Sequence, residues 1–429
     1  MPTIVTHEGE LVPLPASVDR HRVVDQLLRY SAGADFPCFR LKRGALYAAE
    51  VVGAIQIGKL RISILPKSHS GSASGDSEFL LNLLRVAGFL ETKPVKHTAT
   101  VRSTSLDPLE ALLLEVGEEM LHAARVAVPR RYEELASDSE TIRGRIDFQR
   151  LSRRVPGRDS TLPVRYAPLS ASNALSKTLK WVAEALSRMA RTPSTRVVFE
   201  EVLSKFEGVA GRAPTRAEIL GLVITRYEAG WTRIIGIAKL LVDKKFIDPT
   251  FAGREDAFGM LFPLQHLYER ALRRILPNAV QPLGLAVVHR SLPLHMLHDE
   301  GDVPYLRLKP DYVFLYNGAP VMVGDAKWKR LVPDVRAYGV DRADIYQMNA
   351  YLTRYGIARA ILFVPRLSWM DSGWRPRYSV PTTDHQMHLV AVDIESLVSR
   401  APLVRAGALS ALRAALADVT AASAAASAT

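Results

Sequence analysis

Cysteine is almost absent from this sequence of 429 residues, in which Cys38 is the only one. A single thiol cannot form an intramolecular disulfide, and it cannot build a structural zinc site from cysteines. No apolar run reaches the roughly 18 residues that a membrane-spanning helix needs. The first residues, MPTIVTHEGELVPLP, contain acids and prolines and lack the apolar core of a signal peptide. We therefore expect a cytoplasmic protein with no membrane partner.

The overall composition is ordinary except for its charge. Hydrophobic residues make up 48% and charged residues 23% of the chain, as in soluble globular proteins. The length favours two or three domains. The formal net charge is +12, because 56 lysines and arginines outnumber 44 aspartates and glutamates. This excess favours a polyanionic partner such as nucleic acid, although an arginine-rich composition alone gives the same charge.

The stretch around which the rest of the chain is organised covers residues 308–330, LKPDYVFLYNGAPVMVGDAKWKR. Two apolar runs, residues 312–316 and 321–323, are separated by Asn317 and Gly318. An Asn-Gly pair between two apolar runs is the strongest local signal for a β-hairpin. The sequence therefore predicts two antiparallel strands here.

Charged side chains stand at the open end of this predicted hairpin. Asp325 and Lys327 are two residues apart, so on a strand they share a face. A two-residue loop would place Asp311 opposite Gly324 and turn its carboxylate away from Asp325. A three-residue loop with a bulge, residues 317–319, would place Asp311 opposite Asp325. We expect the second register, because two carboxylates and an ammonium then converge.

Such a convergence of charged side chains would destabilise a purely structural hairpin, but it is useful for catalysis. Like charges directly across a sheet repel each other. A hard divalent cation removes that cost, since carboxylates and water are suitable ligands for Mg²⁺. The ion can polarise a phosphoryl oxygen and lower the pKa of a bound water, and a lysine can stabilise the developing charge. The alternative is an ordinary amphipathic hairpin with charged ends. A Pro-Asp pair at one strand start, Asp-Ala-Lys at the end of the next strand and a tight turn between them form a far more specific signal for catalysis than Asp-x-Lys alone.

The Pro-Asp pair followed by Asp-Ala-Lys resembles the PD-(D/E)xK nuclease superfamily. The whole chain is similar to one branch, the McrC family, the nuclease subunit of modification-dependent, GTP-driven restriction systems. The strings that carry the resemblance are VVGAIQIGKLRISILPK at residues 51–67, VRYAPLSASNALSKTLKWVAEAL at 164–186, LYERAL at 267–272 and DIYQMNAY at 344–351.

The resemblance implies a set of site residues. Asp311 and Asp325 would bind Mg²⁺ together with the backbone carbonyl of Ala326, and Lys327 would assist the attacking water. The reaction would break a phosphodiester bond in double-stranded DNA.

Two further residues are expected near this site, each with an alternative role. Glu269 lies on a predicted helix that carries a metal-binding glutamate in the superfamily, or it pairs with Arg273. Gln347 lies on the predicted helix after the catalytic strand. It would position the water or contact the DNA backbone, or it is an exposed helical glutamine.

Residues 128–148, VPRRYEELASDSETIRGRIDF, are the most distinctive stretch outside the hairpin and resemble the R-Y…L-R-G-R-I pattern of the family. They form either a basic finger that reaches a partner or an arginine-bearing turn at Gly144. In the finger, Arg143 or Arg145 would stabilise phosphoryl-transfer charge in the partner's nucleotide site. The sequence does not discriminate between these two arginines.

The family's partner is a hexameric AAA+ GTPase, McrB-like, which this chain would dock on and stimulate. The chain lacks the G-x-x-x-x-G-K-[ST] loop, so GTP must be bound elsewhere. Recognition of a modified, methylcytosine-type base would also belong to the partner. A second hypothesis is an adaptor that activates the motor with little or no cleavage, and a third is a basic DNA-binding protein that acts alone.

For the fold we expect an α+β protein of several domains. A β-rich N-terminal partner-docking domain covers 1–100 and a mainly helical region with the basic stretch covers 101–255. A restriction-endonuclease-like α/β core with a mixed sheet, the PD-(D/E)xK domain, covers 256–400. Residues 295–302 are expected to be a polar loop, and residues 401–429 an alanine-rich helix with a disordered tail.

Overall fold

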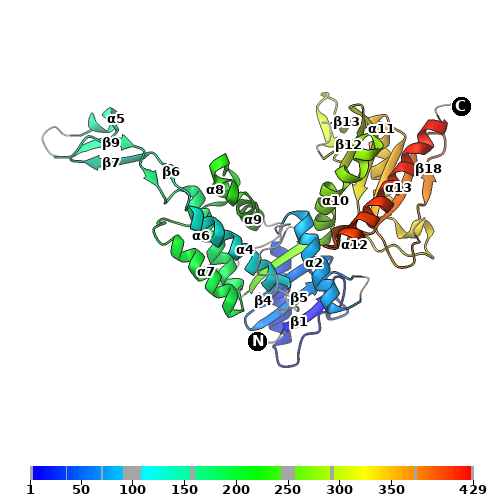
Figure 1. Cartoon of the computed structure of the whole chain (residues 1–429), viewed down its shortest axis with the longest axis horizontal. Helices are drawn as coiled ribbons and strands as arrows, with labels where there is room; N and C mark the ends of the chain where they lie inside the picture. The colour runs from blue at the N-terminus through cyan, green and yellow to red at the C-terminus, as the bar shows by residue number, and fades with distance from the viewer. Residues whose placement is uncertain are drawn as a thin grey trace.

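The structure is a computed structural model that describes residues 3–34, 36–68, 71–89, 108–154, 160–242, 257–289, 294–371 and 374–426. Figure 1 shows an N-terminal sheet at the base, a helical region that extends into a long arm on one side, and a second sheet with its helices on the other side. Among the described helices, none is long and apolar enough to cross a membrane.

The N-terminal sheet has four strands in the order β1-β5-β4-β11. Strands β4 (Val51–Ile57) and β5 (Leu60–Leu65) form an antiparallel hairpin, and β1 (Thr3–His7) lies parallel to β5. A smaller hairpin, β2 (Phe39–Lys42) with β3 (Ala45–Ala48), and helix α1 (Arg20–Gly33) pack beside this sheet. The β-rich expectation did not include this helix.

Strand β11 (Ala257–Pro263) joins the N-terminal sheet to the C-terminal part. It pairs with β4 where Gly53 has φ +126°, and a Cβ on Gly53 would lie 1.9 Å from the carbonyl oxygen of Met260. Only glycine fits at this crossing. The expected domain boundaries near 100 and 255 lie outside the described residues. The expectation that the nuclease core begins at 256 needs one correction, because β11 completes the N-terminal sheet.

The middle region is helical, as expected. Its helix α6 (Ala174–Met189) is capped by Asn173, whose side chain accepts a hydrogen bond from the Ser176 amide at 3.0 Å. The neighbouring helices are α4 (Pro108–Val126), α7 (Pro193–Lys205), α8 (Arg216–Leu220) and α9 (Thr232–Val242).

An arm of short strands projects from these helices (Figure 1). Strands β7 (Leu135–Ser139), β9 (Leu162–Tyr166) and β8 (Arg145–Ile146) form a small sheet in the order β7-β9-β8, and α5 (Phe148–Leu151) follows β8. At the base of the arm, β6 (Arg131–Tyr132) pairs with β10 (Leu169–Ser170). The basic stretch that the sequence singles out therefore lies on a projection from the body.

The C-terminal sheet has six strands in the order β12-β15-β16-β17-β19-β18. The strands are β12 (Leu285–Val288), β15 (Tyr312–Tyr316), β16 (Ala319–Ala326), β17 (Arg359–Pro365), β19 (Gln386–Val392) and β18 (Arg377–Ser379). Strands β16, β17 and β19 run parallel, and the other pairs are antiparallel, so the sheet is mixed as expected. Buried residues of α10 (Leu264–Val280) pack on one face, and those of α11 (Arg342–Tyr355) pack on the other.

One expectation for the C-terminal part is wrong. The segment expected to be a polar loop forms a hairpin, β13 (His295–His298) with β14 (Pro304–Arg307). Its polar residues form the turn, in which Asp299 Oδ1 accepts hydrogen bonds from the Gly301 and Val303 amides. The expected alanine-rich helix is present as α13 (Pro402–Ala426), since alanine has the highest helix propensity of all residues. The last residues of the expected disordered tail, 427–429, lie outside the described residues.

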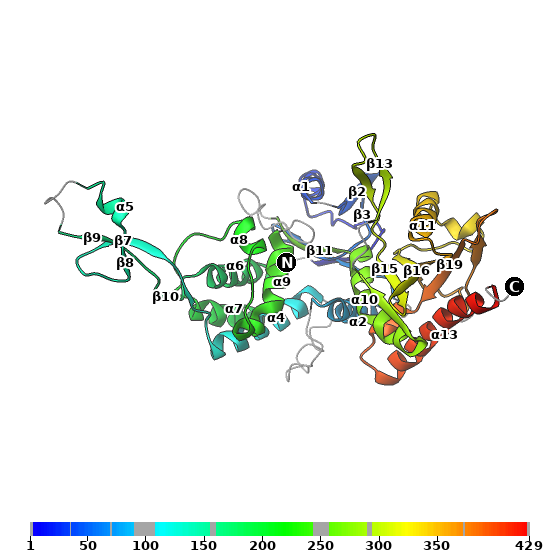
Figure 2. The same ribbon diagram turned by 90° about the horizontal axis from the view of Figure 1, so that it is seen from above.

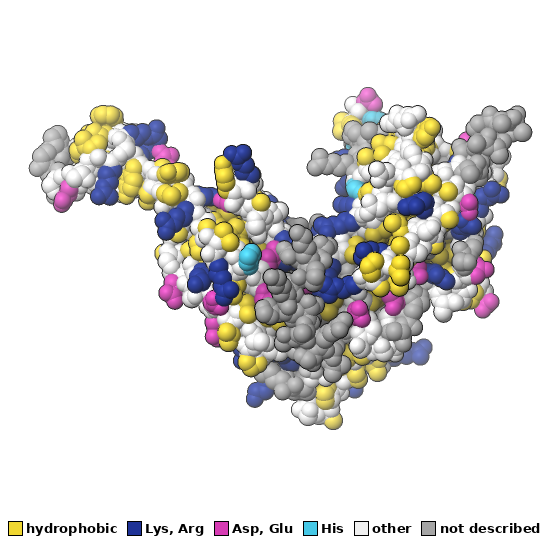
Figure 3. Space-filling view, viewed as in Figure 1, with side chains coloured by type: hydrophobic (Ala, Val, Ile, Leu, Met, Phe, Trp, Pro, Cys, Tyr) yellow, Lys and Arg dark blue, Asp and Glu magenta, His cyan; other side chains and the backbone are white. Residues whose placement is uncertain are grey.

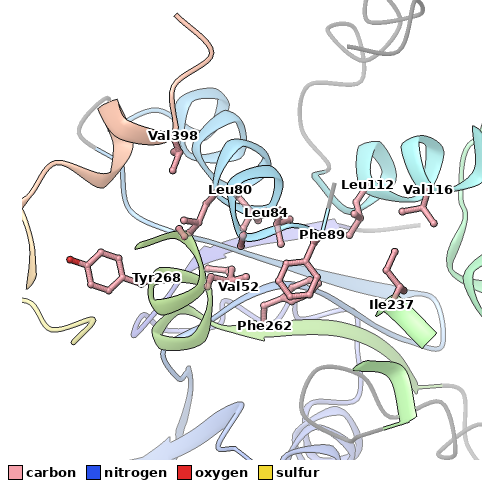
Figure 4. Close-up of a cluster of buried hydrophobic side chains, with 14 of the residues drawn as sticks. Val52, Leu80, Leu84, Phe89, Leu112, Val116, Ile237, Phe262, Tyr268 and Val398 are labelled. Atoms are coloured by element: carbon pink, nitrogen blue, oxygen red, sulfur yellow. The ribbon is translucent and has the colours of Figure 1, made fainter. Parts of the chain in front are cut away.

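One hydrophobic core connects the three parts (Figure 4). It contains side chains from both sheets and from the helices between them, including those of α2 (Ala73–Ala87) and α12 (Ile394–Val398). The labelled members are Val52, Leu80, Leu84, Phe89, Leu112, Val116, Ile237, Phe262, Tyr268 and Val398. This continuous burial favours a fixed arrangement of the two sheets and the helical region.

Candidate active site

The hairpin β15–β16 has a shorter turn than the sequence analysis expected. Tyr316 pairs with Ala319, so Asn317 and Gly318 alone form the turn, both with positive φ, 48° and 82°. The extra residue lies inside the second strand, where the pairing shifts past Val321. The expected three-residue loop is therefore wrong, and the expected bulge is displaced from the turn into β16.

The consequence for register is nevertheless the expected one. Tyr312 pairs with Gly324, so Asp311, one residue earlier, stands opposite Asp325. The Ala326 amide donates a hydrogen bond to Oδ2 of Asp311 at 2.8 Å and fixes this end of the hairpin. The Lys327 Nζ lies 2.8 Å from Oδ2 of Asp325, which is only 3% exposed. The three predicted side chains therefore meet at one end of the hairpin.

Burial and mutual charge determine how these groups ionise. Burial raises the pKa of the Asp311 carboxyl, and the charges of Asp325 and Glu269 raise it further. Burial also raises the pKa of Asp325, although Lys327 opposes the shift. For Lys327, burial lowers the pKa, but the charges of Asp325 and Asp344 outweigh burial and raise it above its usual value. The lysine therefore stays charged, and a further cation would favour ionisation of both carboxyls.

Helix α11 supplies partners for the lysine. Asp344 Oδ1 lies 3.3 Å from Lys327 Nζ, and Asp344 Oδ2 accepts a hydrogen bond from Lys329 Nζ at 2.5 Å. The Lys327 ammonium also donates to Gln347 Oε1 at 3.4 Å, and Gln347 Nε2 donates to the Tyr351 hydroxyl at 2.8 Å. Gln347 thus lies at the site, where it holds the lysine. Sequence analysis missed Asp344, although its spacing of three residues from Gln347 places both on one face of a helix.

Helix α10 approaches from the other side with Glu269. Its Oε1 accepts a hydrogen bond from Arg273 at 2.6 Å, which is the alternative pairing that the sequence allowed. Its charge nevertheless contributes to the raised pKa values of both Asp311 and Asp325. The Tyr312 hydroxyl donates to the Glu269 carbonyl oxygen at 2.9 Å and ties this helix to β15.

A second residue of α10 orients the backbone of the catalytic strand. Gln265 Nε2 donates to the Ala326 carbonyl oxygen at 2.6 Å, and its Oε1 accepts from the Trp328 amide at 2.7 Å. The carbonyl expected to bind a metal is therefore oriented by a side-chain amide, with one lone pair left for another partner. Nothing in the sequence pattern singled out Gln265, because this contact joins segments 61 residues apart.

The donor set fits a hard cation with few protein ligands. In the described part of the chain, no group of three or more histidine, cysteine, aspartate or glutamate side chains could hold a metal ion. This excludes there a site built entirely from such side chains. Mg²⁺ is usually held by one or two carboxylates and keeps several waters. Asp311 and Asp325 with the Ala326 carbonyl oxygen meet that description.

The arm distinguishes the two candidate arginines. The Arg145 guanidinium pairs with Glu134 at 2.6 Å. Arg143 is exposed and, within the described chain, makes no ion pair or side-chain hydrogen bond. It follows Ile142, an apolar side chain that is 64% exposed. Figure 3 shows further hydrophobic side chains on the surface of the arm. Arg143 is therefore the arginine that is free to meet a partner.

The family model described as McrBC 5-methylcytosine restriction system component matches residues 46–365, well over half of the chain. The chain belongs to this family. The matched residues of this McrBC component include the arm, both strands of the site hairpin and helix α11. No curated protein matches the sequence.

Two solved structures from Thermococcus gammatolerans have a similar fold. One is a refined half-complex from a tetradecameric assembly of McrB AAA+ hexamers with bound McrC, with a TM-score of 0.65 and 16% identity over 97% of this chain and 100% of that chain. The other is the McrBC complex, with a TM-score of 0.51 and 16% identity over 65% of this chain and 88% of that chain. At this identity the likeness concerns the fold alone.

Proposed function

We propose that this chain is the Mg²⁺-dependent DNA endonuclease subunit of a GTP-driven restriction complex that acts on DNA with methylcytosine-type modification. One observation carries the proposal: Asp311 and Asp325 stand opposite each other at the end of the hairpin, with the Lys327 ammonium 2.8 Å from Asp325. The mixed sheet around this hairpin is the arrangement expected of a PD-(D/E)xK core.

Asp311, Asp325 and the Ala326 carbonyl oxygen would hold the ion. When bound, Mg²⁺ polarises a phosphoryl oxygen and makes a coordinated water more acidic. Lys327 places its ammonium beside this position, where it donates hydrogen bonds to the attacking water or to the phosphate.

The surrounding residues act through that lysine and that carbonyl group. Asp344 and Gln347 restrain the Lys327 ammonium from the α11 side. Gln265 orients the Ala326 carbonyl from the α10 side. Such positioning lowers the cost of bringing the reacting groups together.

Substitution of the lysine tests the proposal. Lys327→Ala should abolish cleavage of modified DNA in the presence of Mg²⁺, GTP and the partner, and it should leave assembly and GTP hydrolysis intact. Lys205→Ala, at an exposed lysine that ends α7, removes the same charge far from the site and should cut normally. Normal cleavage by Lys327→Ala would refute the assignment.

We further propose that the chain stimulates GTP hydrolysis by an AAA+ partner. The supporting observation is the arm, which projects from the body and carries Arg143, an exposed arginine with no ion pair among the described residues. An arginine that enters a neighbour's nucleotide site stabilises the charge that develops on the transferred phosphoryl group. The similar structure of McrC bound to McrB AAA+ hexamers supports a partner of this class.

The arm also keeps an adaptor as the second candidate function, in which the chain activates the motor and cuts little or nothing. Measurement of GTP hydrolysis and DNA cleavage in the same mixture separates the two. Stimulation without any cleavage by the unaltered chain, with Mg²⁺ and modified DNA present, would favour the adaptor.

A further inference from the structure

Several arginines with exposed side chains have an acidic partner. Four of them have side chains that are more than half exposed and still form ion pairs. The pairs are Arg29 with Asp25, Arg125 with Glu201, Arg145 with Glu134 and Arg212 with Glu218. The charge of these four arginines is therefore balanced locally by a neighbouring carboxylate.

The β2–β3 hairpin is different. Its sequence from residue 39 is FRLKRGALYA, and Arg40, Lys42 and Arg43 are exposed. In the part of the chain that the structure describes, these three cations form no ion pair with an acid. Nearby acids are already engaged, since Glu10 pairs with Lys67 at 2.7 Å and Asp19 caps helix α1.

The geometry of the hairpin gathers these cations into one surface. Arg40 and Lys42 alternate along β2 and share a face with Tyr47, which pairs with Arg40. The Lys42 ammonium lies 5.9 Å from the centre of the Tyr47 ring. Arg43 and Gly44 have φ of 49° and 74° and form the tight turn at the tip.

A further cation extends this surface onto helix α1. The Arg20 guanidinium donates to the Gly44 carbonyl oxygen at 3.3 Å, so the start of the helix lies beside the turn of the hairpin. We call the surface formed by Arg20, Arg40, Lys42, Arg43 and Tyr47 the basic hairpin face.

Contacts link the base of this hairpin to the segment that follows the catalytic strand. The Ala48 amide at the end of β3 donates to the Glu10 carbonyl oxygen at 2.9 Å. Two residues before Glu10, the Glu8 carboxyl is within electrostatic reach of Arg330, which is three residues past Lys327. Figure 2 shows α1, β2 and β3 on the same side of the molecule as α11, the helix that holds Lys327. The N-terminal sheet thus connects the β2–β3 hairpin to the residues that follow the catalytic strand β16.

We propose that the basic hairpin face binds the phosphate backbone of double-stranded DNA beside the nuclease centre. The inference rests on the proposed function for its substrate. It adds a binding surface on the N-terminal part, outside the sheet that carries the catalytic residues. Unpaired lysines and arginines bind phosphates with release of counterions, so the contact is strong at low salt and independent of sequence.

The test is the salt dependence of DNA binding by the full chain. The triple variant Arg40→Gln, Lys42→Gln and Arg43→Gln should bind a labelled duplex more weakly than the unaltered chain, measured by fluorescence anisotropy without Mg²⁺. The plot of log affinity against log salt should flatten by roughly 0.9 for each lost phosphate contact, or about 2 to 3 in total.

A matched control removes the same number of charges from arginines that have acidic partners. Arg125→Gln, Arg145→Gln and Arg212→Gln together should leave the slope close to that of the unaltered chain. Thermal melting of both triple variants should match the unaltered chain, since all six side chains are on the surface. A hairpin variant with the unaltered slope, or a control that flattens the plot equally, would overturn the inference.

Two outcomes separate this inference from the proposed function. In the first, the DNA affinity of the hairpin variant depends less steeply on salt while the unaltered chain never cuts DNA with Mg²⁺. In that case the DNA-binding role of the basic hairpin face is supported and the nuclease assignment fails. If the chain cuts DNA and the hairpin variant binds it with the unaltered slope, the nuclease stands and the surface is refuted. Loss of binding to the AAA+ partner with unaltered DNA binding would also refute it, in favour of an acidic protein surface.

Discussion

Asp325 and Asp344 at the candidate active site are only 3% and 7% exposed, whereas the Arg145 side chain in the arm is 71% exposed. A charge removed from water is costly unless partners compensate for it, and an exposed ion pair contributes little to stability. These two buried carboxylates are compensated by Lys327 and Lys329, and the neighbouring Asp311 accepts a hydrogen bond from the Ala326 amide. The site therefore holds buried charges at a cost in stability, whereas the arm presents exposed side chains on a projecting shape.

The comparison also concerns how each region finds its ligand. The site is built on two strands and two helices that one core holds in place, so its geometry is set before any ligand binds. The arm carries several exposed apolar side chains, among them Tyr132, Phe148 and Ile142 at 74%, 71% and 64%. Exposed apolar side chains in such a projection indicate a protein partner.

The largest effect of a single substitution is expected in the arm. Arg143→Ala should lower the stimulated GTP hydrolysis of the partner by roughly 10³-fold, as for other arginines that act in trans. Arg145→Ala, whose side chain already pairs with Glu134, is the matched control and should change hydrolysis little. Equal losses in the two variants would show that charge in the arm, rather than one free arginine, causes the effect.

A stability measurement examines the link between the N-terminal sheet and the catalytic strand. Burial raises the pKa of Glu8 from 4.5 to about 7, against the opposing charge of Arg330. The folded state therefore keeps a proton that the unfolded chain releases, and stability falls as pH rises from the unfolded pKa through the folded one. This loss should amount to about 3 kcal/mol.

Glu8→Gln removes this titration. The variant should resist denaturant better than the unaltered chain above pH ~8, and the two should converge below pH ~4. Asp19→Asn, at an exposed acid that caps a helix, is the control for a change in surface charge. A stability difference that is the same at both pH values would contradict a buried, proton-holding Glu8.

A smaller effect is expected at Asp344. Asp344→Asn removes the charge that restrains Lys327 and Lys329 and should reduce cleavage by roughly 10- to 100-fold, in the range for residues that orient a catalytic group. The rate should fall at saturating DNA, with little change in the DNA concentration at half-maximal rate. Asp344→Glu should restore part of the rate. A change confined to DNA affinity would assign Asp344 to substrate binding.

The sequence predicted the meeting of Asp311, Asp325 and Lys327 because strand alternation and hairpin pairing are local. It placed the bulge in the turn, since Val321 resembles any strand residue and nothing in the sequence marks it as unpaired. Gln265 and Asp344 were not predicted as site residues because their partners lie on other elements, and a single sequence does not reveal such contacts. In the arm, the arginines were predicted, but their pairing with acids of other strands was not.

The most direct test of the central claim is the binding of Mn²⁺ in place of Mg²⁺, followed by electron paramagnetic resonance, with cleavage assayed on the same preparations. The unaltered chain should bind the ion and cut DNA with its partner. Asp311→Asn and Asp325→Asn should each lose both properties while GTP hydrolysis stays stimulated. Unaltered ion binding and cleavage in the double variant would contradict the account.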